Sequence, residues 1–223
     1  EMLGSIGDMA IFSFQNGKIM TSGEGGALLT NDVDLYQKAN LIHGVGRPYG
    51  DIAYEHRILG SNYRMNEFQA AILVAQQERL LKMNEKREKN ANLLNSLLLD
   101  VKGIKPQGRK DYATLVTHYM YMFYYNHDYF NKLSRKEFIN YLNAEGIPAF
   151  VCFPVLSETD FFCRNDFGHR IDSYNKNNEA DLSNARKIAD QVVWIPHYTL
   201  LGDELDITEI ALAIKKIQNG LKA

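Results

Sequence analysis

The chain has 223 residues, of which 45% are hydrophobic and 23% are charged, and its formal net charge at pH 7 is −2. This is ordinary globular material with enough residues for one large or two small cores, and the charge gives no case for nucleic acid or an anionic membrane as a partner. No apolar stretch approaches the roughly 20 residues that a membrane-spanning helix needs, and no signal peptide is present, so we expect a cytoplasmic protein.

The first third of the chain alternates short apolar segments with turns. Residues 10–14 and 27–30 are predicted to be short buried strands, from their length and the glycines beside them. A helix is predicted to begin at Asn31-Asp32 and to end near Ile42. The polar segment 44–62 follows, and loops of that length in a compact domain are usually functional or mobile.

A long helix is predicted next, with Asn66 as its N-cap and its end near Leu99. The first half of this helix is apolar, with Phe68, Ala71, Ile72, Val74, Ala75, Leu80 and Leu81. The second half, from Lys82 to Asn92, is mostly charged and is predicted to be solvated. This shift in composition predicts a boundary near residue 80, between a domain at 1–80 and a smaller C-terminal α+β domain at 81–223.

The remaining sequence mixes strand and helix patterns. In the β-rich run 118–125, alternating aromatic residues are expected to form one face of a sheet, namely Tyr119, Tyr121, Phe123 and Tyr125. Ser134-Arg135-Lys136-Glu137 is a capping box that is predicted to open a helix to about Glu145. Further strands are predicted at 149–153 and 192–195, a helical pattern at 182–192, and a last helix from Asp206 or Thr208. The mixture indicates an α/β or α+β class.

One turn carries the most informative side chain. The run Phe12-Ser13-Phe14-Gln15-Asn16-Gly17-Lys18 is followed by Gly23-Glu24-Gly25-Gly26 and the second predicted strand. A lysine held between buried strands is in a setting where the amine becomes a usable nucleophile. The Ser13 hydroxyl can bond a phosphate, and the glycines allow backbone to approach a flat ligand. On spacing alone, a surface lysine in a turn is the alternative.

Together with Gly4-Ser5-Ile6-Gly7-Asp8 and a second block, Gly60-Ser61-Asn62-Tyr63-Arg64-Met65-Asn66-Glu67-Phe68-Gln69-Ala70-Ala71, this run resembles the sugar aminotransferase family (DegT/StrS-type) of pyridoxal-phosphate enzymes. The resemblance extends from Gly4 to the C-terminal helix. It implies the α/β aspartate aminotransferase fold (fold type I), pyridoxal 5'-phosphate as cofactor, and a homodimer with active sites at the subunit interface. It also implies that residues 1–80 are the C-terminal part of the cofactor-binding large domain.

The resemblance assigns roles to three residues. Lys18 would be the Schiff-base lysine, Ser13 would contact the cofactor phosphate in the same subunit, and Asn62 would reach the phosphate of the partner subunit. From the residues alone, Ser13 can equally be a strand-end hydroxyl that bonds local backbone, and Asn62 a turn asparagine. Arg64 and Glu67 are expected to stabilise the loop and the start of the helix.

Three shorter segments resemble a narrower branch of the family, the 3-amino-5-hydroxybenzoate synthases. These segments are Gln15-Asn16-Gly17, Gly46-Arg47-Pro48 and His118-Tyr119-Met120-Tyr121-Met122-Phe123. Arg47 is then a candidate for binding the carboxylate or the hydroxyls of a substrate, because guanidinium is suited to bidentate binding of carboxylates. A loop arginine in a salt bridge is the alternative. His43 and His56, which flank the same loop, are expected to be structural.

The expected reaction is transfer of an amino group, from glutamine or glutamate, to a ketone on a sugar or cyclitol. The alternative within the enzyme class is dehydration and aromatisation of an aminated shikimate-type acid. In the family, a long N-terminal portion precedes the lysine and supplies an acidic partner for the pyridine nitrogen, and no such portion precedes Lys18. We therefore expect the sequence to be the C-terminal part of a larger protein. The alternative outside the enzyme class is a truncated, non-catalytic dimerisation module.

The two cysteines, Cys152 and Cys163, are too few for a disulfide scaffold and are expected to be reduced thiols. Neither lies at metal-ligand spacing from a His or Cys, so no metal site is expected.

Overall fold

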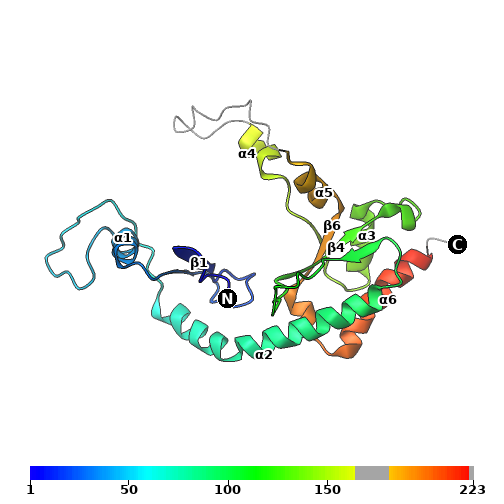
Figure 1. Ribbon diagram of the computed structural model, residues 1–223, viewed down its shortest axis with the longest axis horizontal. Helices are drawn as coiled ribbons and strands as arrows, with labels where there is room; N and C mark the ends of the chain where they lie inside the picture. The colour runs from blue at the N-terminus through cyan, green and yellow to red at the C-terminus, as the bar shows by residue number, and fades with distance from the viewer. Residues whose placement is uncertain (164–180, 221–223) are drawn as a thin grey trace. The chain divides into compact units, whose positions relative to one another are not determined.

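The computed structural model describes residues 1–163 and 181–220. The chain forms two compact units, Glu1–Lys82 and Met83–Ala223. The long helix α2, Glu67–Leu98, contributes its first residues to one unit and its last residues to the other. The expected mixture of helices and strands is confirmed (Figure 1).

In the first unit, β1 (Met9–Ser13) and β2 (Gly26–Thr30) form a two-stranded antiparallel sheet in which Ser13 lies opposite Gly26. The helix α1, Val33–His43, follows β2. It begins where the sequence predicts, because Oδ1 of Asp32 accepts hydrogen bonds from the amides of Asp34 (2.8 Å) and Leu35 (2.9 Å).

The two strands are confirmed, but their predicted burial is wrong in this chain. Ile11 on β1 is 83% exposed and Leu29 on β2 is 53% exposed. Apolar strand residues become buried only when a second layer covers the face of the sheet. The two-stranded sheet leaves most of these side chains exposed in the described chain.

The start of α2 confirms the predicted N-cap. The Gln69 amide donates to Oδ1 of Asn66 (2.9 Å), and the Asn66 amide donates back to Oε1 of Gln69 (3.3 Å). This reciprocal pair is a capping box, which satisfies amides that have no partner within the helix.

The predicted division of α2 into an apolar and a solvated half holds only in part, because the second half has an exposed charged face, with Lys82, Lys86 and Lys89, and also a buried stripe. In the first half, Phe68 is 84% exposed, whereas Arg87 in the charged half is 1% exposed. The buried residues of the second half are Asn84, Arg87, Asn90, Ala91, Leu94 and Leu98. They recur at helical spacing, so one stripe enters the core even though three of its members are polar.

The second unit contains a four-stranded antiparallel sheet in the order β3-β4-β6-β5. Its strands are β3 (Ile104–Pro106), β4 (Met120–Tyr125), β5 (Phe150–Val151) and β6 (Val192–Pro196). The sequence did not predict β3, because three residues that end in proline are too short for an alternating pattern.

The helices of this unit are α3 (Arg135–Ala144), α4 (Asp160–Cys163), α5 (Ser183–Gln191) and α6 (Glu204–Gly220). Short 3₁₀ helices lie at His127–Tyr129, Leu156–Glu158 and His197–Leu201. The predicted capping box of Ser134 and Glu137 is present at the start of α3. The last helix begins slightly earlier than predicted, because Oδ1 of Asp203 caps the amides of Leu205 (2.9 Å) and Asp206 (3.1 Å).

One hydrophobic core joins the second half of α2, the helices α3 and α6, and the sheet (Figure 1). The predicted alternation along β4 is confirmed, since Tyr121, Phe123 and Tyr125 are buried. The helix α6 contributes to this core one apolar face, with buried isoleucines at 207, 210, 214 and 217.

Two further expectations from the sequence concern membrane-spanning helices and the cysteines. None of the helices in the described ranges is both long enough and apolar enough to cross a membrane. Cys152 is a free thiol, and the side chain of Cys163 lies outside the described part of the chain.

Phe138 on α3 provides a test of this core. Its ring is fully buried and is stacked on Tyr125, with 4.3 Å between ring centroids. We expect Phe138→Ala to lower the free energy of unfolding by about 3–5 kcal/mol, through lost burial and a residual cavity. Tyr141→Ala, on the same helix but half exposed, is the control and should cost about 1 kcal/mol or less. Urea denaturation followed by circular dichroism measures both, and equal losses would contradict this packing.

Candidate active site

Lys18 lies immediately after a tight turn that follows β1. The Lys18 amide donates to the Gln15 carbonyl (2.9 Å), and the Gly17 amide donates to Oε1 of Gln15 (2.9 Å). The turn predicted between the two strands is therefore present, and Lys18 is partly buried at its end. Local hydrogen bonds hold the backbone from which the amine projects.

The return segment closes around Phe14. The Phe14 amide donates to the Gly25 carbonyl (2.8 Å), and the Phe14 carbonyl accepts from the Ser22 amide (3.1 Å) and from Oγ1 of Thr21 (2.9 Å). The segment 15–21 is thus a closed loop with both ends fixed on one residue. Lys18 is positioned by this closure as well as by its own turn.

The lysine loop, by which we mean residues 15–25 between β1 and β2, is connected to the start of α2 by hydrogen bonds. Nε2 of Gln69 donates to the Glu24 carbonyl (3.0 Å), and Oγ of Ser22 donates to the same carbonyl (2.9 Å). Gln69 also belongs to the capping box of α2. The structure therefore brings together the two sequence blocks that are separated along the chain, 12–26 and 60–71.

Ser13 is the last residue of β1 and its side chain is exposed. Oγ of Ser13 accepts a long hydrogen bond from the Gln15 amide (3.4 Å). This is the local backbone contact that the sequence left as an alternative. A hydroxyl accepts and donates at the same time, so this contact leaves its hydrogen able to donate to an anion.

Asn62 lies at the end of the long loop, beside the C-terminus of α1. It forms an isolated antiparallel bridge with Gly44, and Tyr63 donates to the His43 carbonyl (3.0 Å). Oδ1 of Asn62 accepts from the Arg64 amide (3.3 Å), and the residue is exposed. The side-chain amide nitrogen of Asn62 is thus carried on a fixed backbone and can donate to a group from outside the chain.

The loop 44–62 is folded back on itself through close backbone contact. A Cβ on Gly46 would lie 2.0 Å from the Ile58 carbonyl oxygen, and a Cβ on Gly60 would lie 2.5 Å from the Gly46 nitrogen. The Arg57 amide donates to the Gly46 carbonyl (2.8 Å). Two segments of the loop can pass each other at this distance only because neither glycine has a side chain.

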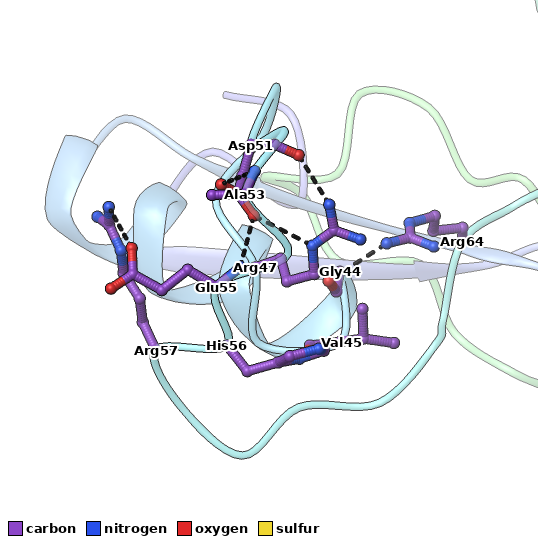
Figure 2. A network of polar contacts seen from close by, with 9 residues as sticks. All are labelled: Gly44, Val45, Arg47, Asp51, Ala53, Glu55, His56, Arg57 and Arg64. Atoms are coloured by element: carbon purple, nitrogen blue, oxygen red, sulfur yellow. Dashed lines mark hydrogen bonds and ion pairs between the residues drawn. The ribbon is translucent and has the colours of Figure 1, made fainter.

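Within this loop, Arg47 is engaged by Asp51 and Tyr54. Nε of Arg47 lies 3.2 Å from Oδ2 of Asp51, and Nη2 donates to the Asp51 carbonyl (2.7 Å), as Figure 2 shows. The guanidinium carbon lies 4.0 Å from the centroid of the Tyr54 ring. The salt bridge that the sequence left as an alternative for Arg47 is therefore present.

The Asp51 carboxylate is the centre of the network in Figure 2. It also accepts from the amides of Ala53 (3.0 Å) and Glu55 (2.9 Å). Burial raises the pKa of this carboxyl, but the two amides and the Arg47 guanidinium outweigh that effect and hold the pKa below its usual value. Asp51 is therefore a stable anion at neutral pH.

A cavity of about 230 Å³ opens beside Arg47, lined by Asn40, His43, Gly44, Arg47, Pro48, Tyr49, Gly50, Asp51 and Arg64. Nη2 of Arg64 donates to the Gly44 carbonyl (3.3 Å), and Nδ1 of His56 lies 2.7 Å from the Val45 carbonyl oxygen. Arg64 and His56 thus stabilise the loop, as the sequence predicted.

Sequence reasoning missed Asp51 and Tyr54. The signal for Asp51 was present, since opposite charges four residues apart are a recognised pairing, although one established for helices. Tyr54 gave no signal. It has a φ of 57°, a conformation that is rare for a residue with a side chain, and only the folded loop shows its ring beside Arg47.

Comparisons with known proteins identify the family of this chain. The DegT/DnrJ/EryC1/StrS aminotransferase family matches residues 1–215. The chain is 37% identical over 209 residues to 3-amino-5-hydroxybenzoate synthase of Amycolatopsis mediterranei (strain S699), with 93% of this chain and 53% of that protein covered. It is 32% identical over 232 residues to L-glutamine:2-deoxy-scyllo-inosose aminotransferase of Streptoalloteichus tenebrarius, with 96% and 54% covered.

Solved structures of aminotransferases are also similar to this chain. A crystal structure of 3-amino-5-hydroxybenzoic acid synthase superposes with a TM-score of 0.81 at 33% identity, covering 96% of this chain and 55% of that one. The aminotransferase PseC of Helicobacter pylori superposes with a TM-score of 0.80 at 22% identity, covering 98% and 55%, which supports the fold alone.

The fold is that of fold-type I pyridoxal-phosphate enzymes, and the chain belongs to the DegT/DnrJ/EryC1/StrS aminotransferase family. Enzymes of this family depend on pyridoxal phosphate. The chain spans about half the length of the curated relatives that it matches.

The crossing at Gly46 provides a test of the loop. Gly46 and Gly50 both have a positive φ (80° and 79°), but a Cβ on Gly50 would have no atom within 4 Å. Gly50→Ala should therefore cost only the strain of a left-handed residue, about 1–2 kcal/mol. Gly46→Ala should cost about 1–3 kcal/mol more, because its Cβ collides with the backbone at Ile58.

The measurements are urea denaturation and hydrogen exchange of the Arg57 amide, which bonds to the Gly46 carbonyl. Exchange should accelerate in Gly46→Ala and change little in Gly50→Ala. Similar behaviour of the two variants would show that the close crossing does not hold the loop.

Proposed function

We propose that this chain is part of a pyridoxal-phosphate-dependent aminotransferase that acts on a keto-sugar, a keto-cyclitol or an aminated shikimate-type acid, with glutamine or glutamate as amino donor. The observation that carries the proposal is the junction of the two family blocks, where Gln69 ties the Lys18 loop to the start of α2. In this proposal, residues 1–80 belong to the cofactor-binding large domain and residues 81–223 form the small domain. We place the enzyme in the cytoplasm, working as a homodimer.

The residues present fit the cofactor. Lys18 offers a primary amine on a turn fixed by hydrogen bonds, and Ser13 offers a hydroxyl whose hydrogen can donate to a phosphate oxygen. The segment between Lys18 and β2 contains Gly23 and Gly25, and β2 itself begins with Gly26, so the backbone there is open to a flat ring. Amine, hydroxyl and bare backbone are three of the features that suit a planar aldehyde phosphate.

The cofactor supplies an electron sink for carbanion chemistry when it is bound. Nζ of Lys18 would hold the cofactor covalently, and its amine would serve as the acid and base that moves a proton at the substrate carbon. Ser13 would orient the phosphate within the same subunit. Asn62, exposed on its bridge to Gly44, would donate to the phosphate in the partner subunit.

Two substrate classes remain candidates. Arg47 favours a carboxylated ring substrate, because its guanidinium lines a cavity of loop residues and can bind a carboxylate. A neutral keto-sugar or cyclitol is the second candidate, supported by the 32% identity to an enzyme named for glutamine and 2-deoxy-scyllo-inosose. The alternative of a non-catalytic dimerisation module is not favoured, since the named relatives are enzymes.

The assignment of Lys18 is tested on the protein at its full natural length. The purified protein should show the visible absorption of lysine-bound pyridoxal phosphate, and borohydride should fix the label on Lys18, identified by peptide mass spectrometry. Lys18→Ala should abolish the absorption band. Lys82→Ala, on the exposed side of α2, is the control and should retain it. A label on another lysine, with the band intact in Lys18→Ala, would refute the assignment.

The action of Asn62 across the dimer is tested by mixing subunits. Asn62→Ala should weaken cofactor binding by about 1.5–3 kcal/mol, the cost of losing one hydrogen bond to a charged phosphate. Because Lys18→Ala and Asn62→Ala would damage different halves of a shared site, a heterodimer of the two variants should contain one intact site.

Each variant alone should be inactive or weak, and the mixture should recover activity. The control mixes Lys18→Ala with Ser13→Ala, which would damage the same half and should recover nothing. If heterodimers form but activity does not return in the first mixture, Asn62 serves its own subunit.

A further inference from the structure

We propose that Asp51 and Tyr54 are positioning residues that hold the Arg47 guanidinium so that its terminal edge binds the carboxylate of an acid substrate in the adjoining cavity. This inference rests on the proposed function and specifies the substrate class for it. Neither residue was singled out by the sequence. The argument depends on which donors of Arg47 are already engaged and which remain.

A guanidinium has five N–H donors in one plane, arranged along a side edge and a terminal edge. Asp51 binds the side edge twice, through Oδ2 at 3.2 Å from Nε and through its carbonyl at 2.7 Å from Nη2. These two bonds fix the plane of the group and its rotation. They leave the terminal edge, Nη1 and the second hydrogen of Nη2, for a bidentate carboxylate.

The Tyr54 ring restrains the group from one face. The guanidinium carbon lies 4.0 Å from the ring centroid, within the range of a cation–π contact. With one edge on Asp51 and one face on Tyr54, Arg47 has little freedom to rotate. A group held in its binding geometry loses less entropy when a ligand arrives, so this arrangement favours affinity.

Charge at the cavity fits a single carboxylate. The charged groups of the lining are the guanidiniums of Arg47 and Arg64 and the carboxylate of Asp51. The pKa of Asp51 lies below its usual value, so the residue stays ionised at neutral pH. One positive charge is therefore left in excess, which a monocarboxylate would neutralise and a neutral sugar would not.

The experiment measures binding to the full-length protein loaded with cofactor, by isothermal titration calorimetry. The probes are 3-amino-5-hydroxybenzoate and its neutral amide, 3-amino-5-hydroxybenzamide, which differ only in the carboxylate. The benzoate should bind at least about tenfold more tightly than the amide, as expected for a charge-assisted bidentate pair.

Variants separate positioning from direct binding. Arg47→Lys should weaken benzoate binding about tenfold to a hundredfold, because the bidentate fork is lost while the charge remains. Asp51→Ala should weaken it about tenfold, and Tyr54→Leu about two- to fivefold. None of the three should change the Kd of the benzamide. In the Arg47→Lys background, Asp51→Ala should have almost no further effect, since it acts through Arg47.

Glu55→Ala is the matched control. Glu55 is a carboxylate of the same loop, but it pairs with Arg57 at 3.5 Å in an exposed contact. Its loss changes the charge of the loop by the same amount as Asp51→Ala without touching Arg47. Glu55→Ala should therefore leave benzoate binding within about twofold of the unsubstituted protein, as is usual for a surface pair.

Three outcomes would overturn the inference: no preference of the unsubstituted protein for benzoate over benzamide, equal effects of Asp51→Ala and Glu55→Ala, or full additivity of Asp51→Ala with Arg47→Lys. The visible absorption of the lysine-bound cofactor is recorded for every variant. Because that band tests Lys18 and not Arg47, its presence together with any of these outcomes would refute the carboxylate site and leave the aminotransferase proposal intact. Its absence in the unsubstituted protein would refute the proposed function itself.

Discussion

The close crossing of backbone at Gly46 and Gly60 is the constraint on which the loop side of the site depends. Atoms of the two segments lie so near that a single added Cβ would fall 2.0 Å from the Ile58 carbonyl oxygen or 2.5 Å from the Gly46 nitrogen. The crossing turns a long polar segment into a folded loop with its own hydrogen bonds. It also fixes Arg47, next to Gly46, and Asn62, two residues after Gly60, on backbone that does not depend on their side chains.

A second constraint acts on the lysine side. Phe14 is bonded through both its amide and its carbonyl to the return segment, and Gln69 joins that segment to the cap of α2. The same glutamine therefore serves helix initiation and loop placement. This dual use explains in physical terms why the two blocks of family residues lie together although more than thirty residues separate them along the chain.

The second unit derives its stability from a different source. Its core contains stacked and edge-on aromatic rings at Tyr125, Phe130 and Phe138, between strands and helices of the same unit. Polar residues of α2 also enter the buried stripe. Nη1 of Arg87 donates to Oδ1 of Asn84 (2.9 Å), and Nδ2 of Asn90 donates to the Leu200 carbonyl (2.9 Å). Burial of a polar group is tolerated where a hydrogen bond replaces one to water, as it does at these two nitrogens, whereas Nε of Arg87 is buried with no hydrogen-bond partner in the described part of the chain.

The sequence by itself determined the features that depend on a few neighbouring residues. The caps at Asp32, Asn66 and Ser134, the alternation along β4 and the turn before Lys18 follow from local hydrogen bonding and side-chain periodicity, and all are present. The tertiary structure alone decided the burial of Arg87, the exposure of Ile11 and the engagement of Arg47 by Asp51 and Tyr54. Burial depends on which elements pack together, and the partner of a charged group depends on how a loop closes, so neither quantity can be read from residue types and spacing.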